Sequence, residues 1–144
     1  MTCEEFALRV QSQLKIPCRV CAVEETRSTN DDLKALACLG EEAGTVLVAF
    51  RQTGGRGRLG RSFYSPDQTG LYLSVLLRPD DAPEDAVFLT PSAAVAATRA
   101  IKTVLHREEE VKWVNDLYLG GKKLAGILTE GEMDKDGKIA YQVV

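Results

Sequence analysis

Two adjacent glycines, Gly120 and Gly121, separate two stretches of strand-forming sequence. These stretches are "VKWVNDLYL" at 111–119 and "KKLAGILTE" at 122–130. A two-residue glycine turn between such stretches is a strong hairpin signal, because it supplies the positive φ angles that tight hairpin turns need. The sequence therefore predicts that these two strands pair antiparallel.

The same turn sets the register of the hairpin. Tyr118 is expected opposite Lys123 and Asp116 opposite Ala125, which makes Asp116 and Lys123 diagonal neighbours, roughly 7–8 Å apart at the backbone. One face then carries Asp116, Tyr118, Lys123, Ala125 and Ile127. A lysine and an aspartate on a face with Ala and Ile indicate a functional site. The alternative is a structural ion pair at the sheet edge.

Strand alternation places two further side chains. Lys112 falls on the same face as Asp116, and Trp113 falls on the opposite face. We therefore expect Trp113 in the core.

The rest of the chain reads as alternating helices and strands. Helices are expected at 3–15, 30–39 and 91–105, and strands at 18–25, 45–50, 71–78 and 138–144. The cap and turn residues that support them are Thr2 with Glu5, Ser28 or Thr29, Thr90 with Pro91, and Asp136 with Gly137. This order predicts an α+β domain with a mostly antiparallel mixed sheet backed by helices.

Composition excludes several classes. A chain of 144 residues suits one domain, and its net charge of −3 disfavours a general nucleic-acid binder. No run approaches the roughly 18 apolar residues of a membrane span, and the start does not resemble a signal peptide, so we expect a cytoplasmic protein. Cys18 and Cys21 form a C-x-x-C without a second ligand pair, so no zinc is expected.

The stretch "RQTGGRGRLGRS" at 51–62 is a local concentration of positive charge and glycine. Glycines let a loop close and bring its N–H groups to a ligand, and arginines match phosphate and carboxylate. The pattern favours binding of an anion, although a solvated flexible loop is the alternative. It is not a P-loop, and it lacks the interleaved aromatic residues of a single-strand nucleic-acid site.

Three blocks, "STN" at 28–30, "QTGGRGRLGRSFYSP" at 52–66 and "VKWVNDLYLGGKKLAGIL" at 111–128, together resemble the biotin protein ligases in order and separation. The resemblance implies the fold shared by class II aminoacyl-tRNA synthetases and biotin ligases. It implies that 1–144 is the N-terminal portion of one catalytic domain, without the C-terminal adenine-covering segment and small barrel. Only 27 residues precede Ser28, so no DNA-binding domain is expected. Phe63 and Val114 depart from the family, which usually has Trp and Pro there.

The resemblance also implies roles for individual residues. Ser28, Thr29, Asn30 and Gln52 would bind biotin; Arg56, Gly57 and Arg58 would fold over biotin and its adenylate; Gly126 and Ile127 would line the biotin pocket; and Lys123, Arg58, Asp116 and Lys112 would form the catalytic set. Lys123 would contact the biotin carboxylate, whereas Lys112 and Asp116 would lie near phosphate and metal. No metal ligand is assigned.

The implied activity joins biotin to a lysine of a biotin carboxyl carrier protein, in acetyl-CoA carboxylase or a related carboxylase. ATP with Mg²⁺ would activate biotin to biotinyl-5′-AMP, and neither nucleic acid nor membrane would take part. A homodimer is compatible with the resemblance. Two alternatives stay open: an inert fragment that only binds biotin, and a lipoate ligase or octanoyl transferase of the same fold.

Overall fold

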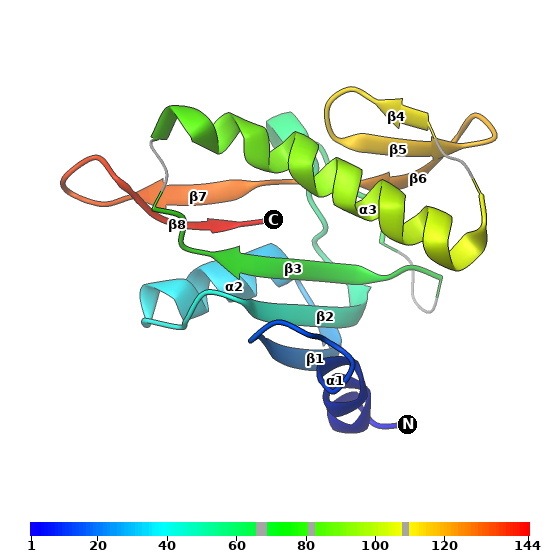
Figure 1. Ribbon diagram of the computed structural model, residues 1–144, viewed down its shortest axis with the longest axis horizontal. Coiled ribbons are helices and arrows are strands. Elements are labelled where there is room, and N and C mark those ends of the chain that lie inside the picture. Colours follow the sequence, from blue (N-terminus) through cyan, green and yellow to red (C-terminus); the bar gives the residue numbers. More distant parts are fainter. Residues whose placement is uncertain (66–68, 81–82, 108–109) are drawn as a thin grey trace.

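The computed structural model describes residues 1–65, 69–80, 83–107 and 110–144 (Figure 1). Its helices are α1 (Cys3–Gln11), α2 (Thr29–Cys38) and α3 (Leu89–Leu105), with two 3₁₀ turns, η1 (Arg58–Gly60) and η2 (Pro83–Phe88). Its strands are β1 (Arg19–Thr26), β2 (Thr45–Gln52), β3 (Tyr72–Leu77), β4 (Glu110–Lys112), β5 (Asp116–Leu119), β6 (Lys122–Gly126), β7 (Glu130–Met133) and β8 (Ile139–Val143).

The described strands form two sheets. The larger has five strands in the order β1-β2-β3-β8-β7, and the smaller has three in the order β4-β5-β6. β1 and β2 run parallel and are joined through α2, as parallel neighbours require a crossover connection. The other pairs are antiparallel. The predicted α+β class with a mostly antiparallel mixed sheet backed by helices is confirmed.

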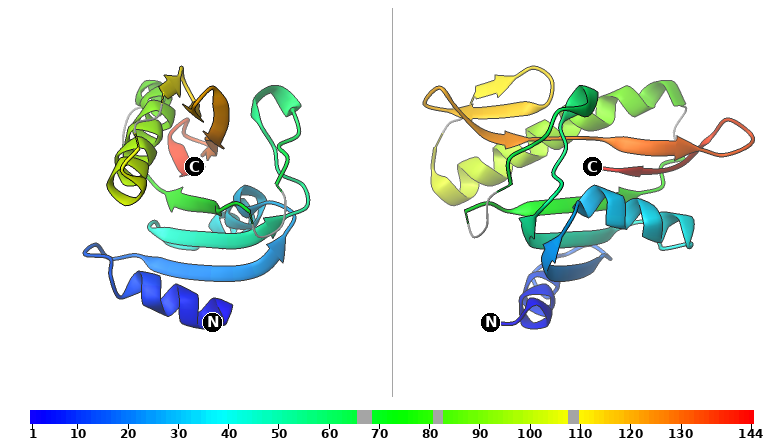
Figure 2. Two further views of the ribbon diagram at one scale, coloured as in Figure 1. Left: turned by 90° about the vertical axis from the view of Figure 1, so that its right-hand side faces the viewer. Right: turned by 180° about the vertical axis from the view of Figure 1, so that it is seen from behind.

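The core lies where α2 packs on the larger sheet. Its buried members are Leu33 and Ala37 from α2 and Leu47, Leu76, Tyr141 and Val143 from the strands. Burying a side chain such as Leu contributes roughly 1.5–3 kcal/mol. α2 and α3 lie on opposite sides of β3 and β8, and α1 lies beside β1 (Figures 1 and 2). The N-terminal end of α2 is thereby fixed beside the ends of β2 and β7.

Two of the predicted helix starts are confirmed and one is wrong. Thr2 and Glu5 form a capping box, and the Ser28 side chain accepts a hydrogen bond from the Asp31 backbone N–H. α3 begins at Leu89 after Phe88, which gives no side-chain cap. The hydroxyl of Thr90 instead hydrogen-bonds with that of Thr129 at 2.9 Å, because a tertiary partner lies within its reach.

The hairpin at Gly120-Gly121 is confirmed, and its register is partly as predicted. Tyr118 is opposite Lys123, but a bulge places Asp116 opposite Gly126 rather than Ala125. The bulge adds one residue to β6, so the register beyond it shifts by one.

The stretch at 111–119 is not one continuous strand. It turns between β4 and β5, and these two strands pair with each other. Trp113 lies in this turn and is 80% exposed, so the prediction that it belongs to the core is wrong. Alternation within a strand does not hold where the backbone leaves the sheet.

None of the helices in the described parts of the chain is both long enough and apolar enough to cross a membrane.

Candidate functional site

A buried polar cluster surrounds the N-terminal end of α2. The backbone N–H and hydroxyl of Thr29 donate to Gln52 Oε1 at 2.8 and 3.1 Å. Ser74 of β3 hydrogen-bonds with the Thr29 hydroxyl at 2.8 Å and with Asn30 Oδ1. Ser28, Thr29, Asn30 and Ser74 are all buried. The structure thus brings together the four residues predicted to bind biotin, which are Ser28, Thr29, Asn30 and Gln52.

Ser74 was missed by the sequence reasoning. It is 1% exposed and occupies an inward position of β3 between apolar neighbours. A serine at a core position of an alternating strand was the available signal, because a buried hydroxyl needs a partner.

The segment joining β6 to β7 connects this cluster to the hairpin. Asn30 Nδ2 donates to the carbonyl of Leu128 at 3.1 Å and to Glu130 Oε2 at 2.9 Å. On the other side, Asn115 Nδ2 donates to the carbonyl of Ile127 at 3.2 Å, and the N–H of Ile127 donates to the Asn115 carbonyl at 2.8 Å. Ile127 therefore lies between the polar cluster and the hairpin.

Arg56 belongs to a half-buried cluster of charges with Asp31, Lys34 and Glu130, here called the Arg56 cluster. Its guanidinium donates to both carboxylate oxygens of Asp31 and, at 2.9 Å, to Glu130 Oε2. Lys34 Nζ lies 3.3 Å from Asp31 and 3.0 Å from Glu130. Asp31 and Glu130 were not predicted, because these acids stand 25 and 74 residues from Arg56 in the sequence.

The cluster changes the acidity of its carboxyl groups. The hydrogen bonds from Arg56 lower the pKa of Asp31 to about 2, against a smaller opposing effect of burial. Burial acts to raise the pKa of Glu130, but hydrogen bonds from Asn30, Lys34 and Arg56 outweigh it and leave that pKa lowered. Both carboxyl groups are therefore held in their charged form.

The tip of the arginine loop is more exposed to solvent than the Arg56 cluster. Gly57 N–H donates to the Arg61 carbonyl at 2.7 Å, which closes the turn that contains η1. Arg58 Nη1 donates to Asn115 Oδ1 at 3.3 Å in an exposed contact. Figure 2 shows the loop rising from the end of β2 to the level of the smaller sheet. The loop tip and the β4–β5 turn are thus in contact.

Lys123 and Asp116 are neighbours, as predicted, and they form the ion pair that the sequence left open as the alternative. Lys123 Nζ lies 2.8 Å from Asp116 Oδ1 and 5.3 Å from the ring centroid of Phe63. A Cβ at Gly126 would lie 3.1 Å from Lys123 Nζ and 3.2 Å from Phe63, so glycine leaves the room that these side chains occupy. The arrangement places one ammonium group beside an aromatic face at the edge of the hairpin.

Lys112 lies on the same face. It is opposite Asp116 in the β4–β5 register, and its Nζ lies 5.4 Å from the ring centroid of Tyr118. Glu110, opposite Tyr118, and Asp116 add two negative charges to this face, which also carries Lys123. Arg58, which contacts the neighbouring Asn115, brings the balance to three positive charges against two, and this suits an anion.

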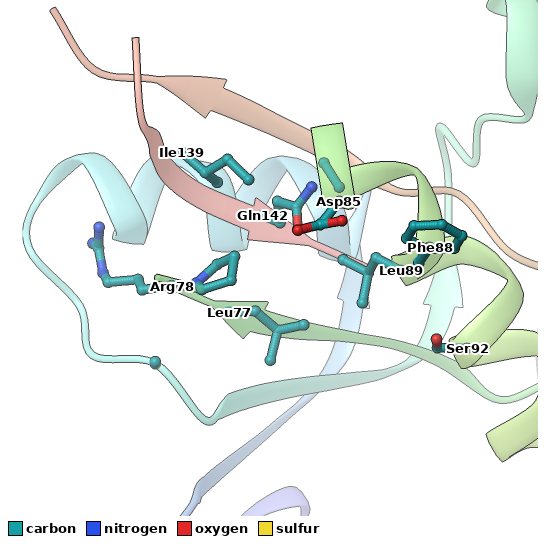
Figure 3. Close-up of a pocket in the computed structure, with 11 residues that line it drawn as sticks. Leu77, Arg78, Asp85, Phe88, Leu89, Ser92, Ile139 and Gln142 are labelled. Carbon is teal, nitrogen blue, oxygen red and sulfur yellow. The ribbon is translucent and has the colours of Figure 1, made fainter. Parts of the chain in front are cut away.

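A pocket of about 380 Å³ lies away from all of these residues (Figure 3). Leu77, Arg78, Phe88, Leu89, Ile139 and Gln142 are among its lining residues. The Arg78 guanidinium donates to the backbone carbonyls of Ala37, Glu41 and Ala140, so it fastens α2 and β8 to the end of β3. None of the predicted site residues lines this pocket.

The described residues contain no group of three or more His, Cys, Asp or Glu side chains placed to hold a metal ion. The Asp116 carboxylate on the hairpin face is already paired with Lys123. These residues do not by themselves form a metal-binding set.

Comparison with known proteins agrees with this arrangement. Residues 22–144 match the Biotin/lipoate A/B protein ligase family. The chain is 38% identical over 109 residues to the bifunctional ligase/repressor BirA of Bacillus subtilis, covering 76% of this chain and 34% of that protein. It is 40% identical over 113 residues to the biotin–[acetyl-CoA-carboxylase] ligase of Mycobacterium tuberculosis, covering 75% of this chain and 42% of that protein.

Solved structures are similar as well. The biotin protein ligase of Leishmania major in complex with biotin gives a TM-score of 0.71 at 29% identity, covering 89% of this chain and 55% of that one. The ligase of Aquifex aeolicus in complex with biotin and ATP gives 0.62 at 33% identity, covering 86% and 50%. The chain thus spans well under two thirds of each of these proteins. It belongs to the biotin/lipoate A/B protein ligase family and matches the catalytic domain of the biotin protein ligases.

Proposed function

We propose that this chain binds biotin, activates it with ATP to biotinyl-5′-AMP, and passes biotin to a lysine of a biotin carboxyl carrier protein. The named activities of its relatives and the biotin and ATP bound in the Aquifex aeolicus structure support the proposal. We place the reaction in the cytoplasm, where ATP and the carboxylases are found.

One observation carries the proposal: a buried neutral hydrogen-bonding cluster and a positively charged strand edge are joined by one short segment. Asn30 of the polar cluster contacts the carbonyl of Leu128 on one side of Ile127, and Asn115 contacts the carbonyl of Ile127 itself. Biotin has a neutral ureido ring at one end and a carboxylate at the other. Its ring needs paired donors and acceptors, and its carboxylate needs a cation.

The proposed roles follow this division. Ser28, Thr29, Asn30 and Gln52 bind the ureido ring, Gly126 and Ile127 line the aliphatic chain of biotin, Gly57 and Arg58 close over the ligand, and Lys123 binds the carboxylate. Asp116 holds Lys123 in place at 2.8 Å, and Lys112 adds positive charge on the same face.

The chemistry requires charge neutralisation rather than a nucleophilic side chain. A carboxylate oxygen of biotin forms a bond to the α-phosphorus of ATP, and pyrophosphate leaves. The lysine amine of the carrier then attacks the acyl carbon, loses a proton, and releases AMP. Lys123 and Arg58 stabilise the anionic groups that approach each other in the first step. Mg²⁺ would accompany the ATP phosphates, and we assign no residue of this chain to it.

The test is incubation of the chain with biotin, MgATP and a carrier domain, followed by mass spectrometry of the carrier. The proposal predicts one added biotin at the acceptor lysine. Biotin binding without adenylate formation would identify an inert biotin-binding fragment. Attachment of lipoate or octanoate in place of biotin would assign the chain to the other branch of the family.

A further inference from the structure

Arg56 and Arg58 stand two residues apart in one loop but have different surroundings. Both terminal nitrogens of Arg56 donate to carboxylates: Asp31 takes one bond from each, and Glu130 takes two from Nη2 at 2.9 and 3.1 Å. Among the described residues, Arg58 donates to one neutral acceptor, Asn115 Oδ1 at 3.3 Å, and its side chain is exposed. The different contacts indicate that the two arginines have different roles.

The energetic difference follows from the partners. For Arg56 to bind a ligand anion, it would have to leave Asp31 and Glu130, whose side chains are only 34% and 25% exposed. Removing one member of a partly desolvated charged pair is costly because the other is left without compensation. Moving Arg58 away from an exposed amide costs far less. Arg56 therefore keeps its carboxylate partners when a ligand binds, whereas Arg58 can exchange Asn115 for a ligand anion.

The backbone divides the loop at the same point. Arg56 and Ser62 form an isolated antiparallel bridge, and Phe63 N–H donates to the Gly55 carbonyl at 2.8 Å. A Cβ on Gly55 would collide with the Phe63 carbonyl and with Ser65 Oγ. Residues 55–56 and 62–63 are thus a paired base, and residues 57–61 are the tip.

The Arg56 cluster also reaches the proposed biotin site. Glu130 Oε2 accepts from Asn30 Nδ2 at 2.9 Å, and Asp31 follows Asn30 in the first turn of α2. The base of the loop is consequently attached to the same helix end that presents the buried polar cluster. A shift of Arg56 would move the loop relative to that end.

We propose that Arg56 is a positioning residue: held by Asp31 and Glu130, it fixes the base of the arginine loop against α2 and β7, so that the tip at 57–61 alone closes over an anionic ligand. The identity of the ligand rests on the proposed function, whereas the attachment of the loop is a property of the ligand-free protein. Arg56 acts through the placement of the tip, and its guanidinium does not contact the ligand.

The attachment is tested without ligand by limited trypsin digestion. Glu130→Gln and Asp31→Asn remove a carboxylate partner of Arg56 and leave the loop's cleavage sites intact. Glu25→Gln is the matched control, because Glu25 pairs with Arg51 at 2.8 Å in an exposed contact. The measured quantity is the rate of cleavage after Arg58 and Arg61 divided by the rate after Arg99 in α3, so that general loosening of the fold cancels.

We expect this ratio to rise roughly tenfold or more in Glu130→Gln and Asp31→Asn, as for loss of a charge-assisted contact, and to stay unchanged in Glu25→Gln. Glu130→Asp keeps the charge on a shorter side chain and should give an intermediate ratio. An unchanged ratio in both Glu130→Gln and Asp31→Asn would overturn the proposal.

A second measurement separates positioning from ligand contact. If Arg56 acts through the cluster, Arg56→Gln and Glu130→Gln each raise the KM for biotin by a similar factor, and the double variant is no worse than the more impaired single one. If Arg56 instead contacts the ligand directly, the opposite is expected. Glu130→Gln then frees Arg56 and leaves biotin binding unchanged or tighter, whereas Arg56→Gln weakens biotin binding. That second pattern contradicts the proposal. If the unmodified chain does not bind biotin, the proposed function fails, while the digestion ratio still decides the attachment of the loop.

Discussion

Lys123 is surrounded by three features that fix its position. Asp116 pairs with its ammonium group at 2.8 Å, the Phe63 ring lies 5.3 Å away, and Gly126 leaves space beside it. An ammonium group held in this way is already oriented when an anion arrives, which reduces the reorganisation needed for charge stabilisation.

Replacing Lys123 with Met therefore removes the charge and keeps the length of the side chain. We expect adenylate formation, measured by pyrophosphate release, to fall by about 10²–10³, as for loss of one donor to a transition-state charge. Lys122→Met is the control, because Lys122 is opposite Leu119 in the register and adjoins the turn. Equal rates in the Lys123→Met variant and the unmodified chain would make Lys123 a structural residue.

Arg58 and Arg61 both lie in the loop tip, and we expect the loss of Arg58 to release biotinyl-5′-AMP. Replacing it with Gly removes the charge-assisted contact to the adenylate that we propose for it, and adds backbone freedom. The loss is worth about 1.5–3 kcal/mol, roughly ten- to a hundredfold in retention of biotinyl-5′-AMP. Lysines of an unrelated bystander protein should then become biotinylated, as detected by blotting with labelled streptavidin. Arg61→Gly is the comparison variant. Bystander labelling by Arg58→Gly that is no greater than that by the unmodified chain would contradict the role given to Arg58.

Substitution of Gly126 is a milder test of the surroundings of Lys123. A Cβ there would approach Lys123 Cε and Phe63 to 3.1 and 3.2 Å, and both are side chains that can shift by a few tenths of an ångström. Gly126→Ala should therefore lower adenylate formation while leaving the thermal midpoint nearly unchanged. A large fall in the midpoint would show instead that Gly126 serves the fold.

At the scale of the elements, local signals were predictable where the responsible contacts are themselves local. The Thr2–Glu5 capping box, the Ser28 cap and the Gly120-Gly121 turn depend on residues within a few positions of each other. The Thr90 cap failed because its hydroxyl has a partner, Thr129, that is distant in the sequence. Sequence periodicity carries no information about such a partner.

The Arg56 cluster joins α2, the loop and β7, and its carboxyl groups make that junction sensitive to acid. The pKa of Asp31 is lowered to about 2 and that of Glu130 is lowered as well. A carboxyl group with a lowered pKa in the folded state contributes stability above its ordinary pKa near 4, and this contribution is lost as the pH falls toward the folded-state value. The junction should thus weaken between about pH 5 and pH 2.

Thermal midpoints measured from pH 7 to pH 2 test this expectation. The unmodified chain should lose stability over the acid range, and the Asp31→Asn, Glu130→Gln double variant should lose less of it over the same range. Glu25→Gln should follow the unmodified curve. Parallel curves for the double variant and the unmodified chain would show that the cluster does not contribute to acid sensitivity.

For the molecule as a whole, the sequence predicted which residues lie together better than it predicted how they are held. Thr29 with Gln52 and Lys123 with Asp116 are each in contact in the structure. The connections between these pairs, through Asn30, Ser74 and Glu130, depend on how α2 and β7 pack, with partners up to 100 residues apart. Motif spacing cannot supply contacts that arise only when distant elements fold together.

The central claim is that the buried polar cluster and the charged hairpin edge together bind biotin, and the most direct measurement is the thermal midpoint of this chain with added ligand. At a biotin concentration about 100 times the dissociation constant, binding to the folded state should add roughly 2.7 kcal/mol of stability and raise the midpoint. Lipoate at the same concentration should leave it unchanged, and Lys123→Met should reduce the biotin effect. A midpoint that rises with lipoate and does not respond to biotin would contradict the account.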